Sequence, residues 1–284
     1  MLVDTHAHLD FPEFQQDLDA VLERAAAAGV RRIVTIGTSV ESSASSIALA
    51  ERYEQIYAVI GIHPTSRPEQ IPDSIGALRK LAAHPKVLAI GETGLDFHRL
   101  PGSREHRRVT AGNPVLSDQD GGTTSSTEDD AYRNAQRTLF NQQLDLAAEL
   151  NLNVVIHQRD AWEDTLEILR GYSGQLRGVF HCFGGTPQQA ATVYELGHLI
   201  SFTGIVTFKN AATVRETAIA VPDNAFMIET DCPYLAPVPH RGKRCEPAFA
   251  KNTAKRIAEL RAVPIECLAE QTTCTAEKFF SFSR

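Results

Sequence analysis

The sequence predicts an α/β protein folded as a (β/α)8 barrel, a TIM-like barrel, with an extra C-terminal helix. Short apolar runs alternate with helical patterns along the 284 residues, and there are eight such runs. Several runs are continuously apolar, as in Val154-Val155-Ile156, which is typical of parallel strands covered on both faces. An open, doubly wound sheet is the alternative architecture.

The eight predicted strands are short apolar runs that are mostly rich in β-branched residues. They are Leu2–Asp4, Arg31–Ile36, Tyr57–Ile60, Val87–Ile90, Asn153–Ile156, Gly178–Phe180, Leu199–Phe202 and Ala225–Glu229.

Each predicted strand precedes a segment with apolar residues at helical spacing. The first such segment places Leu18, Val21, Leu22 and Ala25 on one face and ends before Gly29. The predicted helices are Asp17–Ala28, Ser42–Arg52, Pro68–Ala83, Ala131–Leu150, Ala161–Leu169, Thr186–Leu196, Ala211–Ala220, Pro247–Arg261 and the extra helix Ile265–Phe280.

The chain is predicted to form one barrel domain over residues 1–284, with an insertion at about 101–130 after the fourth strand. Predicted strand starts lie 21 to 30 residues apart, except that Val87 and Asn153 lie 66 apart. The insertion is rich in Gly, Ser, Thr, Asp and Asn, so we expect a flexible loop. A loop after a barrel strand would border the catalytic face.

Composition restricts the setting in which the protein works. Apolar residues make up 43% and charged residues 22% of the chain, as in soluble globular proteins. The formal net charge of −7 argues against nucleic-acid binding through bulk positive charge. The five cysteines show no C-x-x-C spacing, so a reducing, cytoplasmic location is expected. The sequence shows no signal-peptide pattern and no apolar stretch of about 18 residues, so no membrane association is expected.

Side chains that bind metals follow five of the predicted strands. They are His6 and His8 after the first strand, Glu92 after the fourth, His157 after the fifth, His181 after the sixth and Asp231 after the eighth. Each residue alone is most simply a surface or hydrogen-bonded group. In a barrel, however, these strand ends share the face where catalytic residues gather, so together they predict a metal centre.

A bridging carboxylate would let these six ligands hold two divalent ions. Glu92 is the expected bridge, with Asp231 and the two histidines of the first strand on one ion, and His157 and His181 on the other. Two ions about 3.5–4 Å apart would stabilise attacking and leaving oxygens and generate hydroxide near neutral pH. Zinc, manganese or magnesium is expected, and imidazole-rich ligation favours zinc, manganese, nickel or iron over magnesium.

Six motifs along the chain together resemble those of one enzyme family. They are His-Ala-His at 6–8, Gly-Ile-His-Pro at 61–64, Gly-Glu-Thr-Gly-Leu-Asp at 91–96, His-Gln-Arg-Asp at 157–160, His-Cys-Phe-Gly-Gly at 181–185 and Glu-Thr-Asp-Cys-Pro-Tyr-Leu at 229–235. In this order they resemble the TatD-type metal-dependent deoxyribonucleases, a branch of the amidohydrolase-like barrels. The resemblance implies a TIM-like barrel, a divalent-metal site built from the six candidate ligands, and hydrolase activity, often 3′-to-5′ trimming of DNA or RNA.

The resemblance also implies roles other than metal binding. His63 is expected to contact the substrate or its phosphate, or to orient a ligand. Asp231 is expected to accept the proton of the attacking water, and Glu92 completes the predicted catalytic set. Asp96 is expected to brace the loop that follows the fourth strand.

A basic loop follows the eighth strand and resembles the family's basic loop. Arg241, Lys243 and Arg244 lie in it and are expected to bind phosphate, because Arg forks and Lys charges suit that group. A solvated run of charges is the alternative. Cys245 stands where the family usually has Asn before Glu-Pro.

The predicted function is that of a divalent-metal-dependent hydrolase. We expect a 3′–5′ exodeoxyribonuclease or phosphodiesterase that acts on single-stranded DNA or RNA ends through a metal-bound hydroxide. The alternative is a deacylase of D-aminoacyl-tRNA, or another ester or amide hydrolase, because the same ligands serve attack on a carbonyl. A non-enzymatic metal-binding scaffold is a third reading, against which the complete ligand set argues. The expected partner is nucleic acid or another phosphate-bearing substrate.

Overall fold

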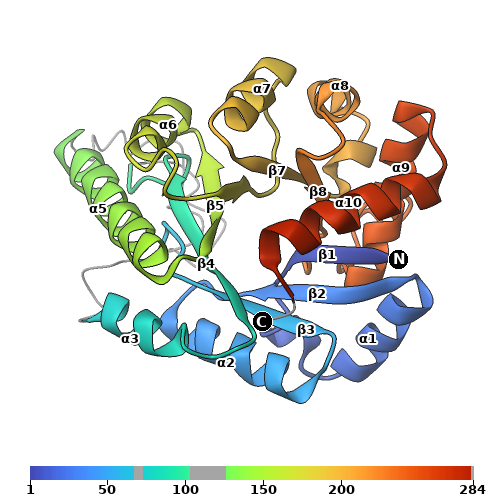
Figure 1. Ribbon diagram of the computed structural model, residues 1–284, viewed down its shortest axis with the longest axis horizontal. Coiled ribbons are helices and arrows are strands. Elements are labelled where there is room, and N and C mark those ends of the chain that lie inside the picture. Colours follow the sequence, from blue (N-terminus) through green and yellow to red (C-terminus); the bar gives the residue numbers. More distant parts are fainter. Residues whose placement is uncertain (67–72, 103–125, 283–284) are drawn as a thin grey trace, which may run out of the picture.

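A barrel of eight parallel strands alternating with helices forms the architecture of the protein (Figure 1). The computed structural model describes residues 1–66, 73–102 and 126–282. The strands follow one another around the sheet in chain order, and every neighbouring pair is parallel. This order confirms the predicted barrel and excludes the open, doubly wound sheet.

The strands are short, as expected for a barrel of this size. They are β1 (Leu2–Ala7), β2 (Val30–Ile36), β3 (Ile56–Ile60), β4 (Val87–Asp96), β5 (Asn153–Arg159), β6 (Gly178–Phe180), β7 (Leu199–Phe202) and β8 (Phe226–Ile228).

The barrel closes through the residues that follow β8. Ala7 and Cys232 form a parallel bridge. The Asp231 N–H donates to the His6 carbonyl oxygen at 2.9 Å, and the His8 N–H donates to the Cys232 carbonyl oxygen at 2.8 Å. The end of β1 is therefore bound directly to the loop after β8.

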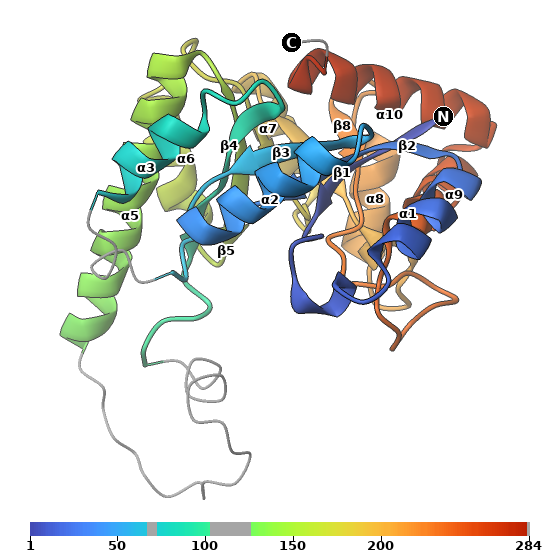
Figure 2. The same cartoon turned by 90° about the horizontal axis from the view of Figure 1, so that it is seen from below.

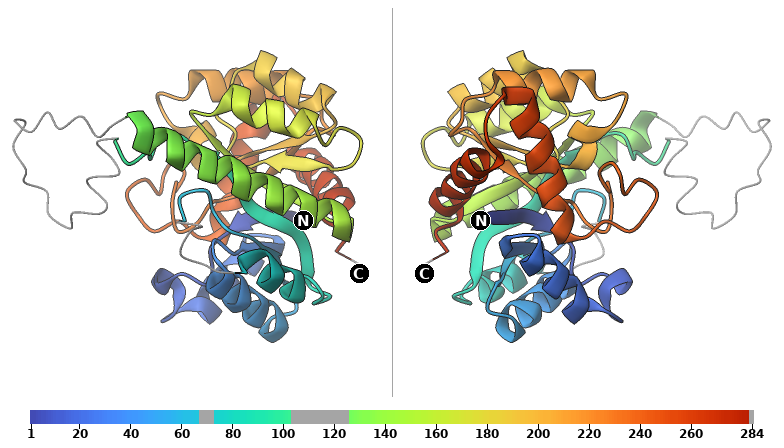
Figure 3. Two further views of the ribbon diagram at one scale, coloured as in Figure 1. Left: turned by 90° about the vertical axis from the view of Figure 1, so that its left-hand side faces the viewer. Right: turned by 90° about the vertical axis from the view of Figure 1, so that its right-hand side faces the viewer.

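Helices cover the outside of the sheet, and α5 packs along β4 (Figure 3). The α-helices are α1 (Leu18–Ala27), α2 (Val40–Arg52), α3 (Ser74–Leu81), α5 (Ser126–Leu150), α6 (Trp162–Arg170), α7 (Pro187–Glu195), α8 (Ala212–Ala220), α9 (Ala250–Arg261) and α10 (Ile265–Phe280). Short 3₁₀ helices are η1 (Pro12–Phe14), η3 (Gly204–Thr207) and η4 (Pro247–Phe249). Within the described residues, no helix is both long and apolar enough to cross a membrane.

The predicted boundaries differ from the structure mainly where polar residues continue a strand. β1, β4 and β5 extend three to six residues beyond their predicted ends, and the added residues include predicted ligands. Helix α5 begins at Ser126, five residues before its predicted start. Most of the predicted insertion, residues 103–125, and residues 68–72 of a predicted helix lie outside the described residues.

Helix α10 covers the amino-terminal end of the barrel (Figure 2). Phe279 and Phe280 pack in one apolar cluster with barrel residues such as Val3 and Leu88. The Thr273 hydroxyl also donates to the Met1 carbonyl oxygen at 3.0 Å. The extra helix is therefore part of the barrel core, and the strand ends at the opposite face remain available for chemistry.

Truncating Phe280 should destabilise the barrel while leaving its opposite face intact. The Phe280 side chain is buried at 1% exposure, and a Phe-to-Ala change at such a site costs about 3–5 kcal/mol. Urea unfolding of Phe280→Ala should show a lowered midpoint. Cys274→Ser, at an exposed position of the same helix, is the matched control. Equal midpoints for the two variants would mean that α10 does not support the barrel.

Candidate metal centre

The carboxyl ends of the strands bring the six predicted ligands into one cluster. They are His6 in β1, His8 just after it, Glu92 in β4, His157 in β5, His181 just after β6 and Asp231 after β8. All six lie at the end of the barrel opposite α10, and all are buried or half-buried. Among the described residues, three groups of possible ligand atoms converge within 4.8 Å: His6, Glu92 and His181; His6, His8 and Asp231; and His63, Glu92 and His157.

Glu92 lies at the centre of the cluster, and its two carboxylate oxygens face different histidines. Oε1 lies 2.8 Å from both His157 Nδ1 and His181 Nε2. Oε2 lies 3.4 Å from His6 Nε2 and 3.8 Å from His8 Nε2. A carboxylate placed in this way can bind a cation through each oxygen.

The two histidines of β1 have a spacing that suits a shared ion. His6 Nε2 and His8 Nε2 lie 3.3 Å apart, and Asp231 Oδ1 lies 3.7 and 3.5 Å from them. Two nitrogens bound tetrahedrally to zinc at about 2.0–2.1 Å lie about 3.3 Å apart. The donor set and its spacing therefore fit a divalent metal.

Irregularities in two strands direct these side chains inward. Between Asp4 and Ala7, β1 contains one residue more than the facing part of β2. Between Ile90 and Thr93, β4 contains one residue more than the facing part of β5. An extra residue bends a strand and turns a side chain toward a new direction. Each irregular stretch contains one predicted ligand.

Two glycines allow β4 to approach β5 closely beside Glu92. Gly91 and Gly94 have φ angles of 149° and 141°, a region that favours glycine. A Cβ on Gly91 would lie 2.6 Å from the Val155 carbonyl oxygen, and one on Gly94 would lie 2.0 Å from the His157 carbonyl oxygen. Any other residue here would push apart the strands that carry Glu92 and His157.

In His8 and His157, the ring nitrogen that points away from Glu92 faces a hydrogen-bond acceptor that orients the ring. His8 Nδ1 lies 3.1 Å from the Ile36 carbonyl oxygen. His157 Nε2 lies 3.3 Å from Asp96 Oδ2, while Asp96 Oδ1 accepts the backbone N–H groups of His98 and Arg99. Asp96 thus braces the loop, as the sequence predicted, and also orients His157. Such contacts fix the tautomer and raise the basicity of metal-binding histidines.

Glu229 supports His181, a contact that the sequence analysis missed. The Glu229 carboxylate accepts hydrogen bonds of 2.6 Å from the Cys182 N–H and the Ser201 hydroxyl, and its Oε1 lies 3.7 Å from His181 Nδ1. The side chain is 1% exposed. The available signal was its position at the end of the predicted eighth strand, two residues before Asp231.

The histidines keep the buried carboxylates ionised. Burial raises the pKa of Glu92, but the charge of His181 and the hydrogen bonds from His157 and His181 hold it well below its usual value. Burial likewise raises the pKa of Asp231, but the neighbouring histidines bring that pKa below its usual value. The cluster therefore presents anionic oxygens, the form that binds cations.

His63 lies on the open side of the cluster as a proton donor. The Thr65 N–H donates to His63 Nδ1 at 3.1 Å, so the proton of the neutral ring is assigned to Nε2. That nitrogen lies 3.4 Å from Glu92 Oε1. Burial is the main cause that lowers the pKa of His63, which favours the neutral ring.

The three basic residues after β8 have different surroundings. Arg244 makes a bidentate ion pair with Asp17 at 2.8 and 2.7 Å and a further contact of 3.0 Å with Glu246. The Arg241 guanidinium lies 3.7 Å from the centre of the Phe208 ring. Arg241 and Lys243 are exposed, and neither forms an ion pair with another described residue. Arg241 and Lys243 therefore carry positive charge that no described carboxylate pairs, whereas Arg244 is held by Asp17 and Glu246.

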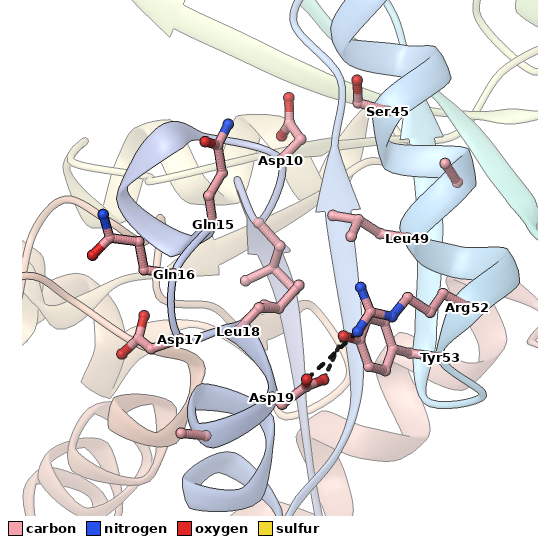
Figure 4. A pocket seen from close by; sticks show the side chains of 13 residues that line it. Asp10, Gln15, Gln16, Asp17, Leu18, Asp19, Ser45, Leu49, Arg52 and Tyr53 are labelled. Atoms are coloured by element: carbon pink, nitrogen blue, oxygen red, sulfur yellow. Dashed lines mark hydrogen bonds and ion pairs between the residues drawn. The ribbon is translucent and has the colours of Figure 1, made fainter.

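A separate cavity of about 590 Å³ lies between the start of α1 and helix α2 (Figure 4). Leu18 and Leu49 line it together with Asp10 and Gln15. At its edge the Tyr53 hydroxyl donates to Asp19 at 2.5 Å. None of the six predicted ligands lines this cavity, so it is distinct from the metal centre.

A parallel eight-stranded barrel with clustered histidines and carboxylates at its carboxyl end is the architecture of a metal-dependent hydrolase. Comparison with known families identifies the group within that class. The model of the family described as TatD related DNase matches residues 3–281, and the chain belongs to this family.

Relatives along the whole chain agree with this membership. The chain is 37% identical over 281 residues to the uncharacterized metal-dependent hydrolase YabD of Bacillus subtilis, with 99% of each chain covered. It is 32% identical to the 3′-5′ ssDNA/RNA exonuclease TatD of Enterobacter lignolyticus, with 98% of each covered. The crystal structure of the Escherichia coli TatD homologue YJJV matches with a TM-score of 0.82 and 30% identity, covering 99% of this chain and 98% of that one. The protein is a metal-dependent hydrolase of the TatD family.

Replacing Glu229 by Gln should weaken metal binding. The substitution keeps the size of the side chain but removes the charge behind His181, and loss of such a partner typically costs about 10–100-fold in metal affinity. Calorimetric titration of metal-free protein with Zn²⁺ or Mn²⁺ measures the change. Ser201→Ala, which removes only one hydrogen bond to the same carboxylate, should have a smaller effect. Unchanged affinity in Glu229→Gln would show that this carboxylate does not act on the metal centre.

Proposed function

We propose that the protein is a phosphodiesterase that binds two divalent ions and removes nucleotides from the 3′ ends of single-stranded DNA or RNA. The reaction adds water to the terminal phosphorus and breaks the bond to the neighbouring 3′-oxygen. The products are a nucleoside 5′-monophosphate and a shortened strand with a 3′-hydroxyl. The name of the Enterobacter relative supports the substrate and the direction.

The position of Glu92 between two sets of histidines carries this proposal. Oε1 faces His157 and His181, whereas Oε2 faces His6 and His8. Divalent ions held on the two sides would act as Lewis acids on phosphate oxygens and on water, which suits displacement at phosphorus. Zinc or manganese fits this imidazole-rich set best, with magnesium as the alternative.

Asp231 is the proposed acceptor of the water proton. Its side chain is 15% exposed, compared with 4% for Glu92 and 0% for His6, so it faces the open side of the cluster. Its Oδ1 faces His6 and His8, while Oδ2 has no hydrogen-bond partner among the described residues. An ionised carboxylate with one free oxygen can take a proton from water that arrives from solvent.

Three side chains at the rim are proposed to hold the phosphate groups of the strand. His63 offers the proton on Nε2 to a phosphate oxygen, and Arg241 and Lys243 offer exposed positive charge. The predicted phosphate contact of Arg244 stays a prediction, and it requires the guanidinium to exchange Asp17 or Glu246 for phosphate. Its present contacts hold the loop in place.

Glu92→Gln should abolish hydrolysis with the fold retained. The change preserves size but removes the charge between the two sets of histidines, so turnover should fall by at least about a thousandfold, or about 4 kcal/mol in activation free energy. The assay follows a 5′-labelled single-stranded oligonucleotide with the metal-loaded protein, and circular dichroism checks the fold. Stepwise shortening by the wild type and none by the variant is expected. Activity within about tenfold of wild type would contradict the central role of Glu92.

A second substrate in that assay separates the proposed function from its alternative. D-aminoacyl-tRNA is offered to the same metal-loaded preparation. Release of the amino acid with the oligonucleotide left intact would assign the site to ester hydrolysis in place of phosphodiester hydrolysis.

Arg241→Ala should raise the KM for oligonucleotides more than Arg244→Ala does. Arg241 carries exposed charge at the rim, whereas two carboxylates already neutralise Arg244. We expect Arg241→Ala to raise KM about tenfold at low salt with little change in kcat, and high salt to reduce the difference. Arg244→Ala should mainly lower the melting temperature. A larger KM effect at Arg244 would show that it leaves its ion pairs to bind phosphate.

A further inference from the structure

Two aromatic side chains form a corner beside the metal centre; we call Phe11 and Tyr234 the aromatic corner. The Phe11 ring stacks on the His8 imidazole, with centroids 4.7 Å apart and planes at 16°. The Tyr234 ring stands nearly perpendicular to Phe11, at 6.3 Å and 75°. The corner is therefore built directly on a predicted ligand and is not used by the proposed chemistry.

Tyr234 is an exposed aromatic residue close to the predicted metal ligand Asp231. Its side chain is 52% exposed, and its N–H donates to the Asp231 carbonyl oxygen at 2.9 Å. A single exposed apolar side chain is ordinary on a protein surface. This one is an aromatic ring held three residues from a predicted ligand, with a face open to solvent. A tyrosine ring in such a place offers a large, rigid contact area.

The two loops that carry the corner are fixed to each other. Arg24 Nε lies 2.7 Å from Glu246 Oε2, and Arg244 binds Asp17 through both terminal nitrogens. These ion pairs join the segment after β1 to the loop after β8, next to the bridge between Ala7 and Cys232. The aromatic corner is therefore preformed, and a ligand would not have to order it.

Charges of both signs lie near Tyr234. Burial, together with the charges of Glu13 and Asp231, raises the pKa of the Tyr234 hydroxyl, and the charge of Arg99 on the loop after β4 opposes that rise. Arg241 and Lys243 lie further along the loop that carries Tyr234. Aromatic rings interspersed with free cations are typical of surfaces that bind single-stranded nucleic acid, where bases stack and phosphates pair with the cations.

We propose that the aromatic corner binds a nucleobase next to the scissile phosphate, with the base stacked on Tyr234 and its edge toward Phe11. This inference rests on the proposed function and adds the ligand chemistry of one subsite: a flat aromatic heterocycle attached to the phosphate under attack. Because every base has a stacking face, the subsite accepts all four bases. It also positions the strand end, because Tyr234 packs against Phe11 and Phe11 stacks on His8.

The test compares two oligonucleotides with three forms of the metal-loaded, full-length protein. One single-stranded oligonucleotide is unmodified, and the other carries abasic tetrahydrofuran residues at its last two positions. The protein forms are the wild type, Tyr234→Ala and the matched control Tyr234→Phe, which keeps the ring. Tyr234 is exposed, so neither substitution removes core packing. KM and kcat are measured for removal of the terminal residue.

The expected result is a change in KM that depends on the base. Tyr234→Ala should raise KM for the unmodified oligonucleotide about tenfold to a hundredfold and leave KM for the abasic one unchanged within about twofold. Tyr234→Phe should behave as the wild type, and kcat should change little. Equal effects of Tyr234→Ala on the KM of both oligonucleotides, or no effect on either KM, would overturn the stacking subsite. Hydrolysis by the wild type would still support the proposed function in that case. Failure of the wild type to shorten either oligonucleotide would overturn the proposed function instead.

Discussion

The buried charge of Glu92 is the constraint on which the site depends. A carboxylate with a side-chain exposure of 4% is costly to bury unless positive charge and hydrogen bonds compensate for it. Five histidines supply hydrogen bonds or charge for that compensation, with ring nitrogens 2.8 to 3.8 Å from its two oxygens: His6, His8, His63, His157 and His181. Because imidazole is only partly protonated near neutral pH, a divalent cation is the group that balances this arrangement most fully.

The barrel could be predicted from the sequence because its signals are local. Continuous apolar runs such as Val154-Val155-Ile156 mark buried parallel strands, and the helical spacing between them fixes their alternation. The predicted ligands could be grouped because residues after parallel strands share one face. Strand length was predicted less well: β4 runs on to Asp96, and its polar residues are all buried. The polarity of a residue alone does not show whether its side chain is buried.

Long-range contacts explain most of what sequence reasoning missed. Glu229, which follows β8, supports His181, which follows β6, although β7 lies between these strands, and no spacing along the chain indicates that pair. Arg244 appeared to be a free cation in a basic loop, but its partner Asp17 lies 227 residues away along the chain. The extra residue in β4 that turns Glu92 inward depends on register with β5, which the order of residues does not reveal.

The distribution of charge decides how such a protein can hold a nucleic acid. Its net charge of −7 makes broad attraction to a polyanion unfavourable. Asp17 and Glu246 neutralise Arg24 and Arg244 at the rim, whereas Arg241 and Lys243, in the loop after β8, form no ion pair with another described residue. In the proposed function, so small a set of positive charges would contact one or two nucleotides beside the metal centre. The proposed removal of nucleotides from strand ends fits this charge balance, because it requires no contact with a long duplex.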